Sequence, residues 1–122
     1  MITTSAPDLL AGPVPTVDLR AAASRVHAGA MLLDVRETDE WDAGHIHQAR
    51  HLPLSKLPVA LGQLPAGADI LVICQAGRRS QTAAGMLARS GRRAVHVEGG
   101  MSAWMRAGLP VVTRNGRPGR AM

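Results

Sequence analysis

The stretch that decides the fold of this chain is DILVICQAGRRS, residues 69–80. After its first residue it is a short apolar run rich in branched side chains, which is typical of a buried strand. A helical pattern follows over residues 80–90 and ends at Gly91. The apolar residues of this pattern share one helix face: Ala83, Ala84, Leu87 and Ala88. A strand that passes through a tight loop directly into a helix is typical of proteins with a parallel sheet.

The same alternation of strand and helix extends to both sides of this stretch. Two more short apolar runs, residues 30–33 and 94–97, predict strands. Helices are predicted over residues 18–28, 38–43 and 102–107, and each is followed by a glycine, which accepts the backbone conformation in which helices often end. The chain therefore predicts an α/β fold in which a mostly parallel sheet carries helices on both faces. Ligands of such folds bind where strand ends meet helix starts, and residues 74–80 lie at such a place.

The length of 122 residues favours one domain. Residues 1–15 contain three prolines, and residues 113–122 are basic and rich in turn formers. We therefore predict an N-terminal tail over residues 1–15, a globular domain over residues 16–112 and a basic C-terminal tail over residues 113–122.

The composition narrows the possible partners. The net charge is +5, and thirteen of the fourteen basic residues are Arg, spread along the chain. Phe and Tyr are absent, which disfavours base stacking and therefore single-stranded nucleic acid as a partner. The positive balance favours small anions through the long-range field. Cys74 is the single cysteine, so a disulfide, a cysteine-based zinc site and a dithiol pair within one chain are excluded.

The sequence also lacks the signals of a membrane or secreted protein. No apolar run is long enough to span a bilayer. The first residues have no positive charge followed by an apolar core, as a secretory signal would have. We therefore expect no membrane partner and a cytoplasmic, reducing location.

Residues 74–80 predict an anion-binding loop. A tight turn between a strand and a helix aims successive backbone N–H groups inward, and the start of the helix adds a positive field. Gly77 relieves the steric demand of the turn, and Ala76 keeps the loop free of bulk. Arg78 and Arg79 add positive charge at the rim, while Ser80 can cap the helix or donate into the loop.

Cys74 lies at the bottom of this predicted loop. There a thiol should ionise more readily than an ordinary cysteine, because amides, helix field and Arg stabilise the thiolate. The plainer interpretation is a small buried residue at the end of a core strand, since free cysteines are often buried. The neighbouring glycine and arginines favour the interpretation of Cys74 as a nucleophile over that of a core residue.

The spacing of Cys74 and Arg79 distinguishes two chemistries. Cysteine phosphatases place an Arg six positions after the Cys, whereas Arg79 is five positions after Cys74 and Ser80 takes the sixth. One residue fewer makes a smaller ring of amides. Such a ring suits a single additional sulfur atom better than a tetrahedral phosphoryl group.

Further motifs accompany the loop along the chain. They are LDVR, EW and GHI within residues 33–46, ARHLPL at 49–54, and GG with AW within 99–104. Together with CQAGRRS at 74–80, they resemble the rhodanese family of sulfurtransferases over about residues 16–112. The resemblance implies a rhodanese-like fold with a five-stranded, mostly parallel sheet flanked by helices.

The resemblance also implies roles for single residues. Cys74 would be the catalytic nucleophile and would carry sulfur as a persulfide. The substrate-binding residues would be those of the loop: Gln75, Ala76, Gly77, Arg78, Arg79 and Ser80. Arg79 is a better candidate than Arg78 for contacting an anionic donor. Asp34 and Arg36 would support the loop through a salt bridge or hydrogen bonds. The family loop often has a basic residue directly after the cysteine, where this chain has Gln75.

Other conspicuous residues are expected to be structural. We expect Glu40 and His45 to hold a helix and the turn after it, and Trp41 and Trp104 to pack in the interior. His45, His47 and His51 lie close in the sequence, but no cysteine or carboxylate completes a ligand set, so we expect no metal site.

The resemblance therefore implies a thiosulfate sulfurtransferase that works by a two-step transfer. Cys74 takes a sulfane sulfur from a small anionic donor and passes it to a nucleophilic acceptor, which is cyanide in vitro and a thiol or protein in the cell. No cofactor is needed, and the chain would be a monomer or homodimer. Two alternatives stay open: a catalytically silent binding or regulatory module of the same fold, and a cysteine phosphatase or arsenate reductase.

Overall fold

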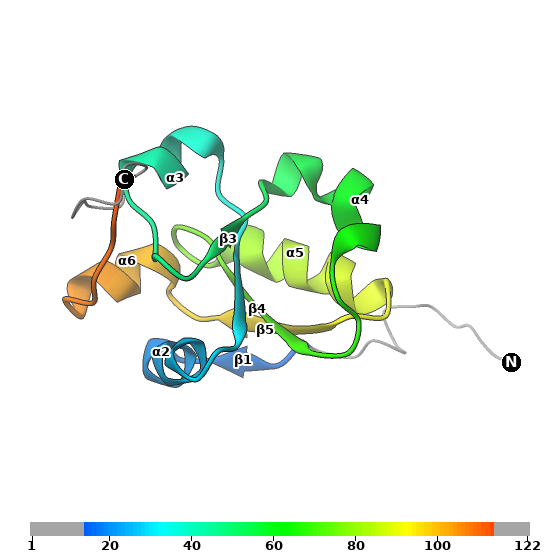
Figure 1. Cartoon of the computed structure of the whole chain (residues 1–122), viewed down its shortest axis with the longest axis horizontal. Helices are drawn as coiled ribbons and strands as arrows, with labels where there is room; N and C mark the ends of the chain where they lie inside the picture. Colours follow the sequence, from blue (N-terminus) through cyan, green and yellow to red (C-terminus); the bar gives the residue numbers. More distant parts are fainter. Residues whose placement is uncertain (1–13, 114–122) are drawn as a thin grey trace, which may run out of the picture.

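Five parallel strands form the sheet at the centre of the fold (Figure 1). We describe residues 14–113 of a computed structural model of the chain; the predicted tail residues 1–13 and 114–122 lie outside the described residues. The strands are β1 (Thr16–Val17), β2 (Met31–Asp34), β3 (Arg50–His51), β4 (Asp69–Ile73) and β5 (Arg93–Val97). Their spatial order is β1-β5-β4-β2-β3. The three strands predicted from apolar runs are its centre, and the predicted five-stranded α/β sheet is confirmed.

Helices cover both faces of this sheet (Figure 1). Helices α2 (Leu19–His27) and α6 (Gly100–Arg106) pack on one face. Helices α4 (Leu57–Ala60) and α5 (Arg78–Arg89) pack on the other, and short 3-10 turns, η1 (Leu54–Lys56) and η2 (Leu61–Gln63), flank α4. Helix α3 (Thr38–Ala43) follows β2. Among the described helices, none is long and apolar enough to cross a membrane.

The side-chain alternation of β4 divides the core into two clusters. Leu71 and Ile73 join the cluster beneath α2 and α6, whereas Ile70, Val72 and Cys74 join the cluster beneath α5. Each fully buried apolar side chain contributes about 1.5–3 kcal/mol. This alternation decides that the cysteine faces the α5 side of the sheet.

The predicted helices are present, and two of them begin earlier than predicted. Helix α2 is capped by Asp18, whose Oδ1 accepts a hydrogen bond from the Ala21 N–H at 2.8 Å. Helix α5 begins at Arg78 and not at Ser80, because Gly77, with φ +107°, turns the chain directly into the helix and arginine is a good helix former. Helix α6 begins at Gly100 and not at residue 102, because Gly99 makes the same kind of turn.

Two parts of the fold had no clear sequence signal. The edge strand β1 is two residues long, and the stretch from η1 to η2 is a series of short turns. Of the ARHLPL motif, only Arg50–His51 pairs as a strand. The carbonyl of Pro15 accepts a hydrogen bond from the His96 N–H at 2.8 Å, so regular pairing reaches back to residue 15.

Candidate active site

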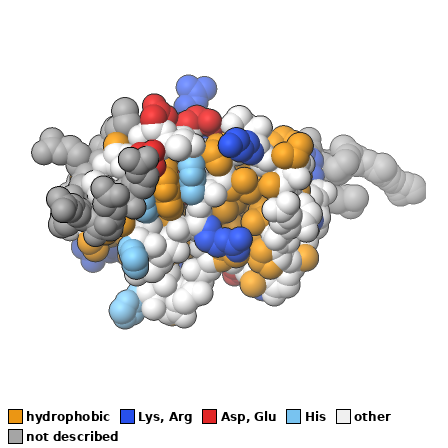
Figure 2. All heavy atoms as spheres, turned by 45° about the horizontal axis from the view of Figure 1, so that its top comes forward, with side chains coloured by type: hydrophobic (Ala, Val, Ile, Leu, Met, Phe, Trp, Pro, Cys, Tyr) orange, Lys and Arg blue, Asp and Glu red, His pale blue; other side chains and the backbone are white. Residues whose placement is uncertain are grey.

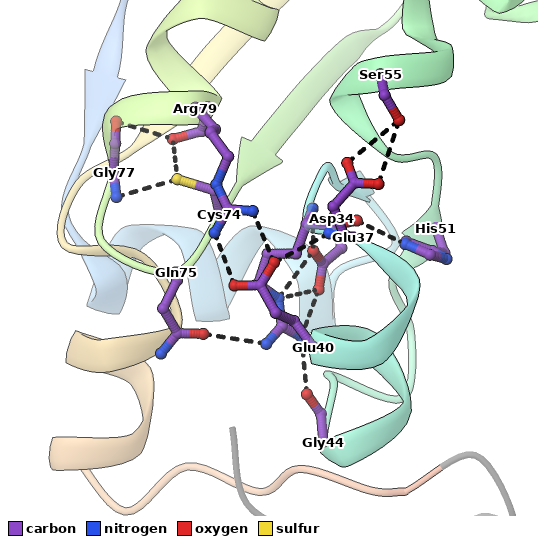
Figure 3. A network of polar contacts seen from close by, with 12 residues as sticks. Asp34, Glu37, Glu40, Gly44, His51, Ser55, Cys74, Gln75, Gly77 and Arg79 are labelled. Carbon is purple, nitrogen blue, oxygen red and sulfur yellow. Dashed lines mark hydrogen bonds and ion pairs between the residues drawn. The ribbon is translucent and has the colours of Figure 1, made fainter. Parts of the chain in front are cut away.

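The loop after β4 lies where the carboxyl ends of β2, β4 and β5 meet the start of α5 (Figure 3). Within this loop, Gly77 caps α5 in the left-handed region, where a side chain would be strained. The predicted loop residues Gln75 and Arg79 are half-buried, Ala76 and Arg78 are exposed, and Gly77 and Ser80 are buried. The loop therefore presents a narrow edge to solvent above a buried cysteine.

Cys74 is buried, with 1% of its surface exposed, and its sulfur contacts two polar groups. The Gly77 N–H donates to Sγ at 3.1 Å, and the thiol donates to Ser80 Oγ at 3.4 Å. In Figure 3 the sulfur points toward Gly77. Cys74 also packs in the apolar cluster beneath α5. The structure thus combines the burial of a core cysteine with a peptide nitrogen aimed at its sulfur.

Ser80 and His96 form a second layer beneath the loop. Ser80 Oγ donates to the Gly77 carbonyl at 3.2 Å and lies 2.9 Å from His96 Nδ1. Both side chains are buried, and burial lowers the pKa of His96, with the charge of Glu98 opposing this effect. No sequence motif marks His96. The signal lies in the alternation of β5, which places residue 96 on the same face of the sheet as Ala94 and Cys74.

Helix α6 holds the opposite side of the loop. The Met101 N–H donates to the Cys74 carbonyl at 2.8 Å, and the Ser102 N–H donates to the Gln75 carbonyl at 2.9 Å. Gly100 makes this approach possible, because a Cβ on it would collide with the Cys74 carbonyl and lie 2.7 Å from that of Gln75. The first turn of α6 therefore fixes the backbone on which Cys74 is mounted.

Arg36 connects the end of β2 to the loop, although its side chain is fully buried. Its guanidinium donates to both carboxylate oxygens of Asp34 at 2.9–3.1 Å, to the Gly44 carbonyl at 2.7 Å and to Gln75 Oε1 at 3.1 Å (Figure 3). A buried ion pair is tolerated only when its hydrogen bonds are satisfied in this way. The structure thus places Asp34 and Arg36 beside the loop, with Gln75 as the point of contact.

Arg79 and Glu40 form an ion pair above the site. Arg79 Nη1 and Nη2 donate to the two Glu40 carboxylate oxygens at 2.6 and 2.8 Å. This bond is the largest cause that lowers the pKa of Glu40, and it raises the pKa of Arg79. Glu40 also accepts from the Glu37 N–H at 3.1 Å in a capping box that starts α3. Glu40 thus caps α3, and it also pairs with Arg79, a contact that the sequence did not predict.

The remaining histidines near the site contact Trp41 and the backbone. The rings of His45 and His51 both stack on Trp41, with centroid distances of 3.6 and 4.7 Å. His45 Nδ1 lies 2.8 Å from the Trp41 carbonyl, and His51 Nε2 lies 2.7 Å from that of Arg36. Within residues 14–113, no group of three or more potential ligands is arranged to hold a metal ion. His47 is exposed.

Basic side chains are scattered over the face shown in Figure 2, interspersed with hydrophobic and uncharged ones. Of the two loop arginines, Arg79 is paired with Glu40 and Arg78 is exposed.

Comparisons with known proteins place this chain in a family. The sequence model of the Rhodanese-like domain family matches residues 18–107, which include the loop and the side chains that contact it. A curated protein named sulfurtransferase, from Allochromatium vinosum, is 34% identical over 87 residues, which are 70% of this chain and 81% of that protein.

Solved structures agree with the sequence match. The crystal structure of a rhodanese-related protein from Thermoplasma volcanium superposes with a TM-score of 0.76 and 33% identity, covering 80% of this chain and 97% of that one. Thiosulfate sulfurtransferase from Pseudomonas aeruginosa superposes with a TM-score of 0.70 and 25% identity. That match covers 82% of this chain and 19% of the larger protein.

Proposed function

The chain belongs to the rhodanese-like domain family, and on this premise we propose that it transfers sulfane sulfur through a persulfide on Cys74, with thiosulfate as a donor. The single observation that carries this proposal is the Gly77 N–H, which donates to Cys74 Sγ at 3.1 Å. A donor already aimed at the sulfur stabilises negative charge there without reorganisation during the reaction.

The transfer takes place in two balanced steps. The Cys74 thiolate attacks the outer sulfur of thiosulfate, the sulfur–sulfur bond of the donor breaks, and sulfite leaves with the electron pair. The new negative charge rests on the outer sulfur of the Cys74 persulfide. A nucleophilic acceptor, a thiol or a protein thiol, then attacks that outer sulfur, and the Cys74 thiolate is regenerated. No metal or organic cofactor takes part in either step.

The size of the loop favours sulfur over phosphate as its cargo. Six residues, from Cys74 to Arg79, form the ring, and helix α5 begins already at Arg78. The helical backbone of Arg78 and Arg79 thereby leaves few residues to surround a ligand.

The test is incubation of the chain with thiosulfate, followed by intact-mass measurement. We expect a gain of one sulfur atom that cyanide removes, and no gain in Cys74→Ala, which has no other thiol to load. Hydrolysis of an aryl phosphate without sulfur loading would instead identify a phosphatase. The absence of both reactions in the folded protein would identify a silent binding module, and either result overturns the proposal.

A further inference from the structure

A buried polar chain beneath the loop is not used in the transfer described above. It runs from Cys74 Sγ to Ser80 Oγ over 3.4 Å and from Ser80 Oγ to His96 Nδ1 over 2.9 Å. The exposed fractions of the three residues are 1%, 0% and 5%. The imidazole lies directly under the turn, since a Cβ on Gly77 would be 3.5 Å from its Cε1. A titratable ring is thus linked to the sulfur by one hydroxyl, away from bulk solvent.

The hydroxyl of Ser80 has one proton and three neighbours. These neighbours are Cys74 Sγ, the Gly77 carbonyl and His96 Nδ1. While Cys74 is a thiol, it donates to Ser80, and the single Ser80 proton can be donated either to the Gly77 carbonyl or to Nδ1. When Cys74 is a thiolate, it needs a donor, and Ser80 can donate to it if Nδ1 carries a proton and donates to Ser80 in turn. The protonation states of Cys74 and His96 are therefore coupled through a single bridging group.

We propose that His96 is a positioning residue that accepts the Cys74 proton through Ser80. In this step the S–H bond of Cys74 breaks and its proton goes to Ser80 Oγ. The original Ser80 proton moves to His96 Nδ1 at the same time. The products are a thiolate and an imidazolium, and no electrons are exchanged with another molecule. The consequence for catalysis rests on the proposed function, because sulfur transfer starts from the thiolate.

The surroundings of His96 keep its ring neutral, and only a neutral ring can accept a proton. Two titratable groups act on it: Cys74 from the end of β4, through Ser80, and Glu98 from the end of its own strand. Helix α5 packs the uncharged Ser80 against it, and β1 on the other side consists of Thr16 and Val17. Burial lowers the pKa of His96 from the ordinary value of 6.5, so the ring is neutral at pH 7 and can take a proton. When the pH falls below the lowered pKa of His96, the ring is already protonated and cannot accept the Cys74 proton.

The test is the pH dependence of Cys74 alkylation by iodoacetamide, measured without any sulfur donor. Cys74 is the only thiol of the chain, so the rate reports on this site alone. With the relay, the proton moves inside the protein, and we expect a component of the rate that does not change with pH between about pH 6.5 and 8. In His96→Asn, which keeps a hydrogen-bonding side chain but cannot titrate, that component is lost. The alkylation rate of this variant then falls by about tenfold for each unit by which the pH is lowered, as expected for a thiol that loses its proton to solvent.

Two further variants separate a relay from a structural effect. Ser80→Ala removes the bridge and is expected to give the same profile as His96→Asn, and the double variant should show no additional change, because coupled residues are not additive. His47→Asn is the matched control, since His47 is exposed, and it should retain the wild-type profile. Should His96→Asn fail to fold, Ser80→Ala tests the same link. Thiolate absorbance in the ultraviolet gives a second measurement where alkylation is slow.

The outcomes decide the proposal independently of sulfur transfer. A pH-independent component that persists in His96→Asn, or that wild type lacks, overturns the relay. Additive effects of Ser80→Ala and His96→Asn overturn it as well. If thiosulfate fails to load Cys74 but the alkylation profile responds to both variants, the proposed function is wrong and the relay stands.

Discussion

Arg79 and Glu40 show how one residue can limit what another is free to bind. Arg79 ends the loop and was expected to contact an anionic donor, yet both of its terminal nitrogens donate to the Glu40 carboxylate at 2.6 and 2.8 Å. About a third of the Arg79 side chain is exposed, so solvent screens the pair and its net contribution to stability is small. An incoming anion therefore competes with Glu40 for the same guanidinium.

Glu40→Gln should strengthen donor binding. The neutral amide releases Arg79, while Gln still completes the capping box of α3. We expect the KM for thiosulfate to fall by about two- to fivefold, the scale of an exposed ion pair, with kcat little changed. Steady-state kinetics at constant ionic strength measures this.

Asp39→Asn is the matched control for that prediction. It removes the same charge from the same helix at an exposed position that the described ion pairs do not include. Equal changes of KM in Asp39→Asn and Glu40→Gln would mean that only the overall charge matters and that the pairing with Arg79 does not.

At the scale of the elements, the loop is held between two helix starts. Helix α5 continues from it at Gly77, and the first turn of α6 donates to the carbonyls of Cys74 and Gln75. The close contact requires Gly100, where φ is +60°. The packing of α6 thus determines the position of the reactive residue, although α6 itself supplies no side chain to the sulfur.

Gly100→Ala should destabilise the protein and slow sulfur loading. A left-handed alanine costs about 1–2 kcal/mol, and the collision of its Cβ with the loop carbonyls adds about 1–3 kcal/mol. Gly108→Ala is the control, because Gly108 also has a positive φ of +74° but no atom within 4 Å of the added Cβ. Urea denaturation should show the larger loss in Gly100→Ala, and equal losses would contradict the contact with the loop.

At the scale of the whole molecule, the parallel sheet gathers the site from distant segments. The carboxyl ends of β2, β4 and β5 lie side by side, and they bring Asp34, Cys74 and His96 to the same end of the sheet. The same packing buries His96, so the stability of the whole fold depends on the protonation of this ring.

The free energy of unfolding should therefore fall as the pH drops below neutrality. Burial lowers the pKa of His96 in the folded chain, so the unfolded chain takes up a proton first as the pH passes 6.5 downward. The stability is fully present above that value and is lost toward the lower folded value, with a slope of at most about 1.4 kcal/mol per pH unit for one proton. Glu40, whose pKa its bond with Arg79 lowers, adds a separate loss only below its ordinary value of 4.5.

Urea denaturation between pH 7 and pH 5 checks this dependence in wild type and His96→Asn. The difference in unfolding free energy between the two proteins should shrink as the pH falls. A difference that stays constant over this range would contradict a buried, titrating His96.

The sequence by itself determined the class of fold, the residues near which the helices stop and the position of the cysteine loop. These depend on short-range patterns: apolar runs, caps such as Asp18, and glycines such as Gly77 where the backbone must turn. Only the tertiary structure decided which side chains meet at the loop. Arg79 pairs with Glu40 across 39 residues, Gln75 joins Arg36 to Ser102, and His96 reaches Ser80 from a neighbouring strand. Such contacts follow from strand register and helix packing, which no local pattern encodes, because they depend on the balance of burial over the whole chain.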